Sequence, residues 1–180
     1  MELEYYAGIG SRETPRDVLQ LMKRIAAELY LRGYVLRSGA APGADTAFEH
    51  GHNAACRAAN GPIRKEIFLP DRWFNDSSSE LHTPSKGAYD IAQSLHPKWS
   101  ACSAFAKKLH ARNTHQILGQ DLLTPVSFVV CWTPPDGRRS GTDQALRVAK
   151  AWPEPIGIFN LNNMKWRPTE LFLHNLGLTP

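Results

Sequence analysis

The chain has 180 residues, of which 42% are hydrophobic and 21% charged, and these values are typical of one soluble globular domain with a full core. We therefore expect a single domain over residues 1–180. No run of about 18 apolar residues occurs, and the N-terminus enters strand-like sequence directly, so we expect a cytoplasmic protein without a membrane partner. The formal net charge of +4 favours anionic partners, although the basic residues are scattered or paired.

Three cysteines and two close pairs of histidines are the candidates for disulfides or metal ligands: Cys56, Cys102, Cys131, His50, His52, His110 and His115. The cysteines are far apart and form no CxxC motif, which favours buried thiols over a disulfide framework or a zinc site. Neither histidine pair has a third ligand at metal spacing, so surface or capping roles are favoured. We expect neither a metal nor a cofactor.

The first unit of the chain has the pattern strand, glycine turn, helix. Residues 3–7 form an apolar run that stops at the turn Gly8–Arg12. Thr14 and Pro15 then supply the N-cap and the first-turn proline of a helix, which Gly33 ends.

The second unit repeats the pattern and contains the most informative stretch. A strand over residues 34–37 leads into the loop Ser38–Asp45, and a helix follows from about 44 to 59. Gly39 and Gly43 would let a ligand approach the backbone, and the free N–H groups of the helix favour an anion there. A tight connection between a strand and a helix also needs glycine for steric reasons alone, so this motif by itself leaves both interpretations open.

The remaining elements follow an alternating order. Residues 66–70 are typical of a short strand, and residues 75–86 of a mobile loop. Helices over 88–95 and 103–118 form an insertion before the fourth strand, 126–132, whose nearly uniform apolar character is typical of a central parallel strand.

A third glycine loop, Asp136–Thr142, opens another helix that runs toward Trp152. Residues 155–161 then form a last strand and residues 169–176 a closing helix. This alternation predicts an α/β fold, with a Rossmann-like, mainly parallel sheet and helices on both faces. Ligands in such sheets bind at the carboxyl ends of the strands, where all three glycine loops should meet.

Three ordered motifs carry a resemblance to a known family: Gly8–Arg12, Ser38–Asp45 and Gly141–Ala145. With the helix that contains residues 109–113, they resemble the SLOG superfamily of Rossmann-like proteins over roughly residues 5–161. Within this superfamily, the motifs resemble especially the phage-type proteins that resemble DNA processing protein A. The resemblance implies binding of a nucleotide or nucleotide-derived ligand, or of single-stranded DNA.

Another branch of the superfamily, the Lonely Guy phosphoribohydrolases, cleaves nucleoside monophosphates with a glutamate three residues after a Gly-Thr pair. This chain has Ala145 at that position, and neither Asp143 nor Gln144 replaces the glutamate at the same helical phase. Asp143 could still reach the pocket from another angle. We therefore favour a binding protein over an enzyme and name no catalytic residue.

The expected ligand-binding residues lie in the three loops, on the inserted helix and at the end of the fourth strand: Gly8, Gly10, Ser11, Arg12, Ser38, Gly39, Gly43, Asp45, Arg112, Asn113, Trp132, Gly141 and Thr142. Ser11 and Arg12 have the groups to hold a phosphate. Asp45 would either bind a ribose hydroxyl or cap its helix, and Thr142 would either bind phosphate or only open its helix.

Arg112 and Asn113 would either cover the pocket or lie on a solvated face. Trp73, Trp99 and Trp132 are candidates to stack on a base, although tryptophan is usually packed in the core. Trp132 is the preferred candidate because it adjoins a loop at a strand end.

These expectations lead to three functional hypotheses. The first is capture of a phosphate-bearing nucleotide or signal molecule, which the protein senses or sequesters. The second is a single-stranded DNA-binding recombination mediator, with a continuous basic groove and strong salt dependence. The third is a nucleoside monophosphate phosphoribohydrolase. We also expect a homo-oligomer.

Overall fold

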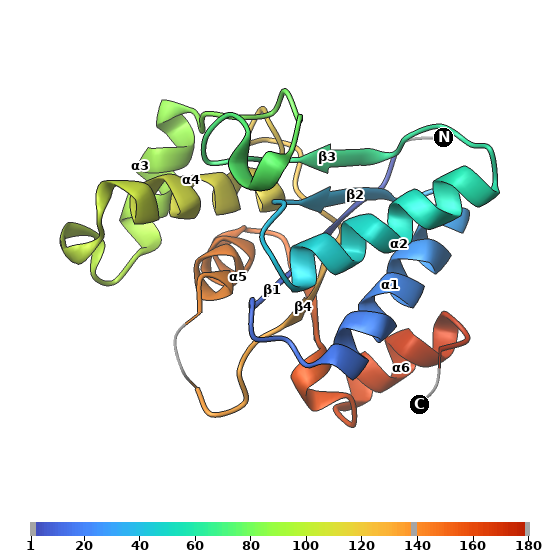
Figure 1. Cartoon of the computed structure of the whole chain (residues 1–180). Coiled ribbons are helices and arrows are strands. Elements are labelled where there is room, and N and C mark those ends of the chain that lie inside the picture. The colour runs from blue at the N-terminus through green and yellow to red at the C-terminus, as the bar shows by residue number, and fades with distance from the viewer. Residues whose placement is uncertain (1–2, 138–139, 179–180) are drawn as a thin grey trace.

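The computed structural model describes residues 3–137 and 140–178 and confirms the predicted α/β fold (Figure 1). Its sheet has five parallel strands in the order β3-β2-β1-β4-β5. The strands are β1 (Tyr5–Gly10), β2 (Val35–Ser38), β3 (Lys65–Ile67), β4 (Phe128–Trp132) and β5 (Gly157–Asn160). Strand β1 lies in the middle of the sheet, with β2 and β3 on one side and β4 and β5 on the other. The direction in which strands are added to the sheet therefore reverses after β3, and the switch point lies between β1 and β4.

Helices cover both faces of this sheet (Figure 1). The α-helices are α1 (Arg16–Leu31), α2 (Ala44–Ala58), α3 (Lys86–Leu95), α4 (Ala104–Leu118), α5 (Thr142–Ala151) and α6 (Arg167–Asn175). Short 3₁₀ turns are η1 (Phe74–Asp76), η2 (Trp99–Ala101) and η3 (Leu161–Asn163). Helices α1, α2 and α6 pack on one face, and α4 and α5 on the other. The inserted α3 packs against α4 and α5.

The central strands alternate their side chains between two cores. In β1, Tyr6 joins the core under α1, α2 and α6, whereas Ala7 and Ile9 join the core under α4 and α5. The same alternation divides β4, with Val130 in the first core and Cys131 in the second. Since both faces are covered, both sets are apolar, as a central parallel strand requires.

Several element boundaries differ from the sequence expectation. The predicted N-cap Thr14 was wrong, because Pro15 occupies that position and the Thr14 hydroxyl donates instead to the Ser11 carbonyl at 2.7 Å. Strand β3 ends at Ile67 rather than at residue 70. Part of the expected loop over 75–86 is tied to the loop that follows β2, since the Asn75 amide donates to the Ala40 carbonyl at 2.8 Å.

The helical insertion is confirmed between β3 and β4, and it brings α4 beside the carboxyl ends of the first two strands. Ser85 and Ser103 cap α3 and α4, each accepting a hydrogen bond from a backbone N–H three residues later. No helix in the described ranges is both long and apolar enough to cross a bilayer.

Candidate functional site

A cavity of about 520 Å³ lies at the carboxyl ends of β1, β2 and β4. All three glycine loops reach it: Ser11 follows β1, Pro42 follows β2, and Gly141 begins the segment that opens α5. Helix α4 supplies a further wall. In the third loop, residues 138–139 lie outside the described part of the chain. The three loops therefore meet at the sheet edge where ligands of parallel α/β proteins bind.

Eight of the thirteen expected residues line this cavity: Gly10, Ser11, Arg12, Asp45, Arg112, Asn113, Gly141 and Thr142. Five are not among the described residues that line it: Gly8, Ser38, Gly39, Gly43 and Trp132. The structure gives each of these five a packing or hydrogen-bonding role inside the fold.

The three glycines of this second group allow close packing. A Cβ at Gly8 would lie 2.6 Å from the Phe48 ring, and one at Gly39 would overlap the Arg112 guanidinium at 1.4 Å from Nη1. Gly43 has φ +89°, and a Cβ there would lie 2.9 Å from the Arg12 Cα. For these positions the steric interpretation of the glycine loop explains the sequence, as close backbone and side-chain approach requires.

Ser38 and Trp132 also act within the fold. The buried Ser38 hydroxyl donates to the Gly8 carbonyl at 2.7 Å and so joins β2 to β1. Trp132 points into the core under α1, α2 and α6, and it is only 7% exposed. The other two candidate tryptophans are not among the described lining residues either; Trp73 is exposed, and Trp99 packs against His96.

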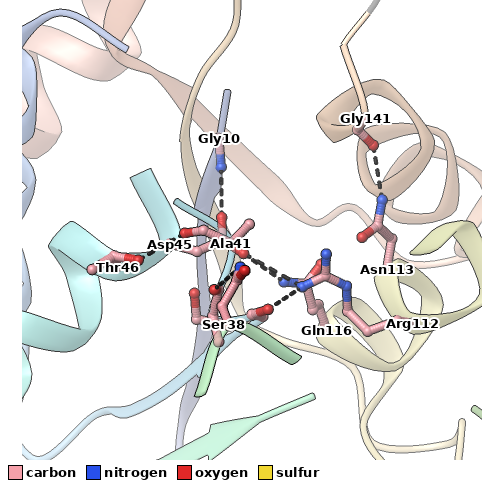
Figure 2. Close-up of polar contacts among 12 residues, drawn as sticks. Gly10, Ser38, Ala41, Asp45, Thr46, Arg112, Asn113, Gln116 and Gly141 are labelled. Atoms are coloured by element: carbon pink, nitrogen blue, oxygen red, sulfur yellow. Dashed lines mark hydrogen bonds and ion pairs between the residues drawn. The ribbon is translucent and has the colours of Figure 1, made fainter. Parts of the chain in front are cut away.

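Asp45 connects three segments at the floor of the cavity (Figure 2). Its carboxylate accepts the Gly10 N–H at 3.2 Å and the Gln116 amide at 3.3 Å, and lies 3.6 Å from Arg112 Nη1. Burial raises the pKa of Asp45, and the positive charge of Arg112 and these hydrogen bonds oppose that rise. Asp45 does not cap α2 through its side chain, so it links the end of β1 to α2 and α4.

Arg112 crosses from α4 to the loop after β2 and is 5% exposed. Its Nη1 donates to the Gly39 carbonyl at 2.5 Å and pairs with Asp45. Its Nε is buried without a hydrogen-bond partner among the described residues. Burial lowers the pKa of Arg112, and the Asp45 carboxylate opposes this effect. Arg112 is therefore a buried wall of the cavity rather than part of a solvated face.

Two helices begin beside the cavity without a side-chain cap. Gly43 and Gly141 occupy the N-cap positions of α2 and α5, and neither offers a side-chain acceptor. The Asn113 amide donates to the Gly141 carbonyl at 2.8 Å, which fixes α5 against α4 (Figure 2). Thr142, in the first turn of α5, lines the cavity. The Thr46 and Asp143 N–H groups of these first turns donate to the Ala41 and Ser140 carbonyls, and the helix starts place a partial positive charge beside this space.

Arg12 is the exposed cation of the cavity wall. It forms no hydrogen bond or ion pair within residues 3–137 and 140–178, and its charge lowers the pKa of Arg112. Its backbone lies against Gly43, so the loop after β1 and the start of α2 converge. Glu13 follows Arg12 and also lines the cavity, so this edge carries one positive and one negative side chain.

Sequence reasoning missed several cavity residues, among them a glutamine and two phenylalanines. Gln116 lies one helical turn after Arg112, and a search of α4 for side chains at i+4 would have found it. Phe74 and Phe105 form an aromatic wall, with ring centroids 6.3 Å apart. Phe74 follows Trp73, which has a left-handed backbone, so no strand or helix period indicated where its side chain points.

Ala145, which occupies the position of the hydrolase glutamate, lines the cavity and is fully buried. Asp143 accepts the Ser140 N–H at 2.9 Å and is not among the described lining residues. The carboxylates in the described lining are those of Glu13 and Asp45. Comparison of the chain with models of known protein families, with curated proteins and with solved structures found no match.

Proposed function

We propose that the protein binds a phosphate-bearing nucleotide or nucleotide-derived signal molecule in this cavity, and that it holds the ligand rather than cleaving it. The observation that carries the proposal is the convergence of Arg12 with the uncapped start of α2. An exposed guanidinium beside free helix N–H groups can hold a phosphate by charge-assisted hydrogen bonds. The uncapped start of α5 adds a second group of donors.

The size and lining of the cavity support a ligand of nucleotide size. A volume of about 520 Å³ lies within the usual range for small-molecule sites, which favours one such molecule over a strand of DNA. Phe74, Phe105 and Leu109 provide an apolar wall on which a base can stack. The amides of Asn75 and Gln116 offer polar groups that can recognise the edge of the base or the ribose.

Capture without cleavage is supported by Ala145 and Asp45, because neither side chain is suited to act as a general base. Ala145 has no titratable group. Asp45 already pairs with Arg112 and accepts hydrogen bonds from Gly10 and Gln116, so its carboxylate is committed to holding the fold together. A general base must be able to take up a proton from the reacting group, which such a committed carboxylate does poorly.

The test is incubation of the purified protein with a panel of nucleoside mono-, di- and triphosphates, cyclic nucleotides and nucleotide conjugates. Native mass spectrometry would then measure the bound species, and the released small molecules would be identified after denaturation. We expect one intact ligand per chain. Release of free base with ribose phosphate would instead support the hydrolase, and an absence of bound nucleotide would contradict the proposal.

A second arm of the same experiment measures binding of single-stranded DNA at several salt concentrations. Under the proposal, nucleotide binding changes little with salt relative to any DNA binding, because few ionic contacts form. Tight DNA binding that weakens steeply with salt, without retention of any nucleotide, would support the recombination mediator and contradict nucleotide capture.

A further inference from the structure

Two histidines and a cysteine that are separate in sequence come together beside the inserted helices. His96 follows α3, Cys102 follows η2, and His110 lies in the middle of α4. One ligand atom from each of the three lies within 4.8 Å of the others. The Cys102 Sγ is 3.8 Å from both ring nitrogens of His96, and the two imidazole centroids are 4.5 Å apart. The sequence paired His110 with His115, and the fold instead places His110 with His96 and Cys102.

These separations are close to those around a tetrahedral zinc ion. Typical Zn–S and Zn–N bonds of about 2.3 and 2.0–2.1 Å place sulfur and nitrogen ligands roughly 3.6 Å apart, and two nitrogens roughly 3.4 Å apart. The observed distance between Cys102 and His96 matches this geometry within a few tenths of an ångström. Closing the remaining gap to His110 needs a movement on the order of 1 Å, which side-chain rotation can supply.

The donor set is one that binds borderline and soft metals. Thiolate and imidazole ligands select zinc over magnesium or calcium, which prefer oxygen. In addition, the Nδ1 atom of His110 is buried and has no hydrogen-bond partner among the described residues. An unsatisfied buried nitrogen is costly, and coordination of a metal through this unprotonated atom removes that cost.

The surroundings indicate what such an ion would do. The Trp99 ring lies 6.1 Å from the His96 ring and 6.4 Å from the His110 ring, so it shields one side of the cluster. Leu109 and Arg112, the neighbours of His110 on α4, line the nucleotide cavity. An ion held by all three ligands would therefore fasten the segment after α3 to the helix that forms the cavity wall.

We propose that His96, Cys102 and His110 form a Zn²⁺ site, with water as the fourth ligand. On binding, the Cys102 thiol loses its proton to solvent and the sulfur forms the metal bond as a thiolate. Coordination through His96 Nδ1 replaces the hydrogen bond that this atom accepts from the Lys98 N–H at 3.2 Å. The site is independent of the proposed nucleotide function.

The test uses tag-free, full-length protein that has been dialysed against a chelator and then titrated with Co²⁺, followed by competition with Zn²⁺. We expect one Co²⁺ per chain and a thiolate-to-cobalt absorption band in the near ultraviolet, which Zn²⁺ abolishes. Cys102→Ser should lose this band and bind Zn²⁺ at least tenfold more weakly. The matched control is Cys56→Ser, since Cys56 is also half-buried and lies on α2, away from the cluster.

Circular dichroism would confirm that each variant is folded, and the wild-type titration decides the question even if a variant fails to fold. Absence of a thiolate band in the wild type would overturn the proposal. Loss of the band in Cys56→Ser with its retention in Cys102→Ser would also overturn it, because a different thiol would then hold the metal.

Discussion

The Arg112 guanidinium occupies the space that a side chain at Gly39 would need, since a Cβ there would lie 1.4 Å from Nη1. No left-handed backbone is required at Gly39, so glycine is present for close packing, since a Cβ there would also lie 2.5 Å from the Gln116 amide nitrogen. The same Arg112 nitrogen donates to the Gly39 carbonyl and pairs with Asp45. The absence of a Cβ at Gly39 therefore allows Arg112 of α4 to pack against the loop after β2, so that α4 forms a wall of the cavity.

We predict that Gly39→Ala lowers the free energy of unfolding by about 3 kcal/mol, because Arg112 must leave its place and Asp45 loses its partner. Urea denaturation followed by circular dichroism measures this change. The control is Gly141→Ala, where an added Cβ meets nothing within 4 Å and the expected change is within about 0.5 kcal/mol. Equal stability of the two variants would show that Arg112 relocates without cost.

The buried pair of Asp45 and Arg112 should behave as one unit. Asp45→Asn leaves a buried guanidinium without its counter-ion, and Arg112→Met leaves a buried carboxylate, so each should destabilise the protein by roughly 3–5 kcal/mol. The double variant should lose less than the sum of the two by at least about 1 kcal/mol. A double-mutant cycle from denaturation curves measures this coupling, and strictly additive losses would show that the two charges act independently.

Acid should destabilise the fold through His52, which is buried with its ring edge-on to Tyr30 at 5.0 Å. Burial, with a smaller effect from the nearby Lys65, lowers its pKa to about 4. Because the unfolded chain binds this proton more readily, with a pKa near 6.5, the contribution of His52 to stability is complete above about pH 6.5. It is lost as the pH falls toward 4, by on the order of 2–3 kcal/mol.

The check is the free energy of unfolding measured from pH 7 to pH 4.5 for the wild type and His52→Gln. The variant should be less stable at pH 7, because it fills the space less well, but should lose less stability over this range. The other histidines are present in both proteins, so their effects cancel in the comparison. Parallel pH profiles would contradict the assignment to His52.

The sequence was sufficient for the fold because strand-like and helix-like segments alternate along the chain, with glycine loops after the first, second and fourth strands. It also located the cavity, since Ser11, Asp45 and Gly141 follow three strands that end at one edge. The boundaries near Thr14 and Ile67 could not be fixed, because one depends on whether the Thr14 hydroxyl caps the helix or donates to Ser11, and the other on a small shift at a strand end.

Trp132 shows why one residue expected in the cavity packs in the core instead. A strand directs successive side chains to opposite faces, and the register of β4 against β1 turns Trp132 toward the core under α1 and α6. Position at a strand end alone does not reveal which face a side chain takes. Phe105, which does line the cavity, lies on the inserted helix, and the docking of this insertion depends on tertiary contacts such as Arg112 with Gly39.

Under the proposed function, Arg12 and the start of α2 hold the phosphate of a nucleotide. Removing Arg12 should cost the complex a charge-assisted hydrogen bond of about 1.5–3 kcal/mol, which is roughly a tenfold to hundredfold loss of affinity. Stability should hardly change, since Arg12 is exposed and makes no contact that supports the core. Arg57→Ala is the control, because it removes the same charge from the opposite end of α2.

The most direct measurement is calorimetric titration of the nucleotide retained in the panel into the wild type, Arg12→Ala and Arg57→Ala, each beside a thermal melt. We predict one ligand per chain, wild-type affinity for Arg57→Ala, and tenfold to hundredfold weaker binding for Arg12→Ala with an unchanged melt. Wild-type affinity in Arg12→Ala would contradict the account, and a collapsed melt in that variant would show that Arg12 serves the fold instead.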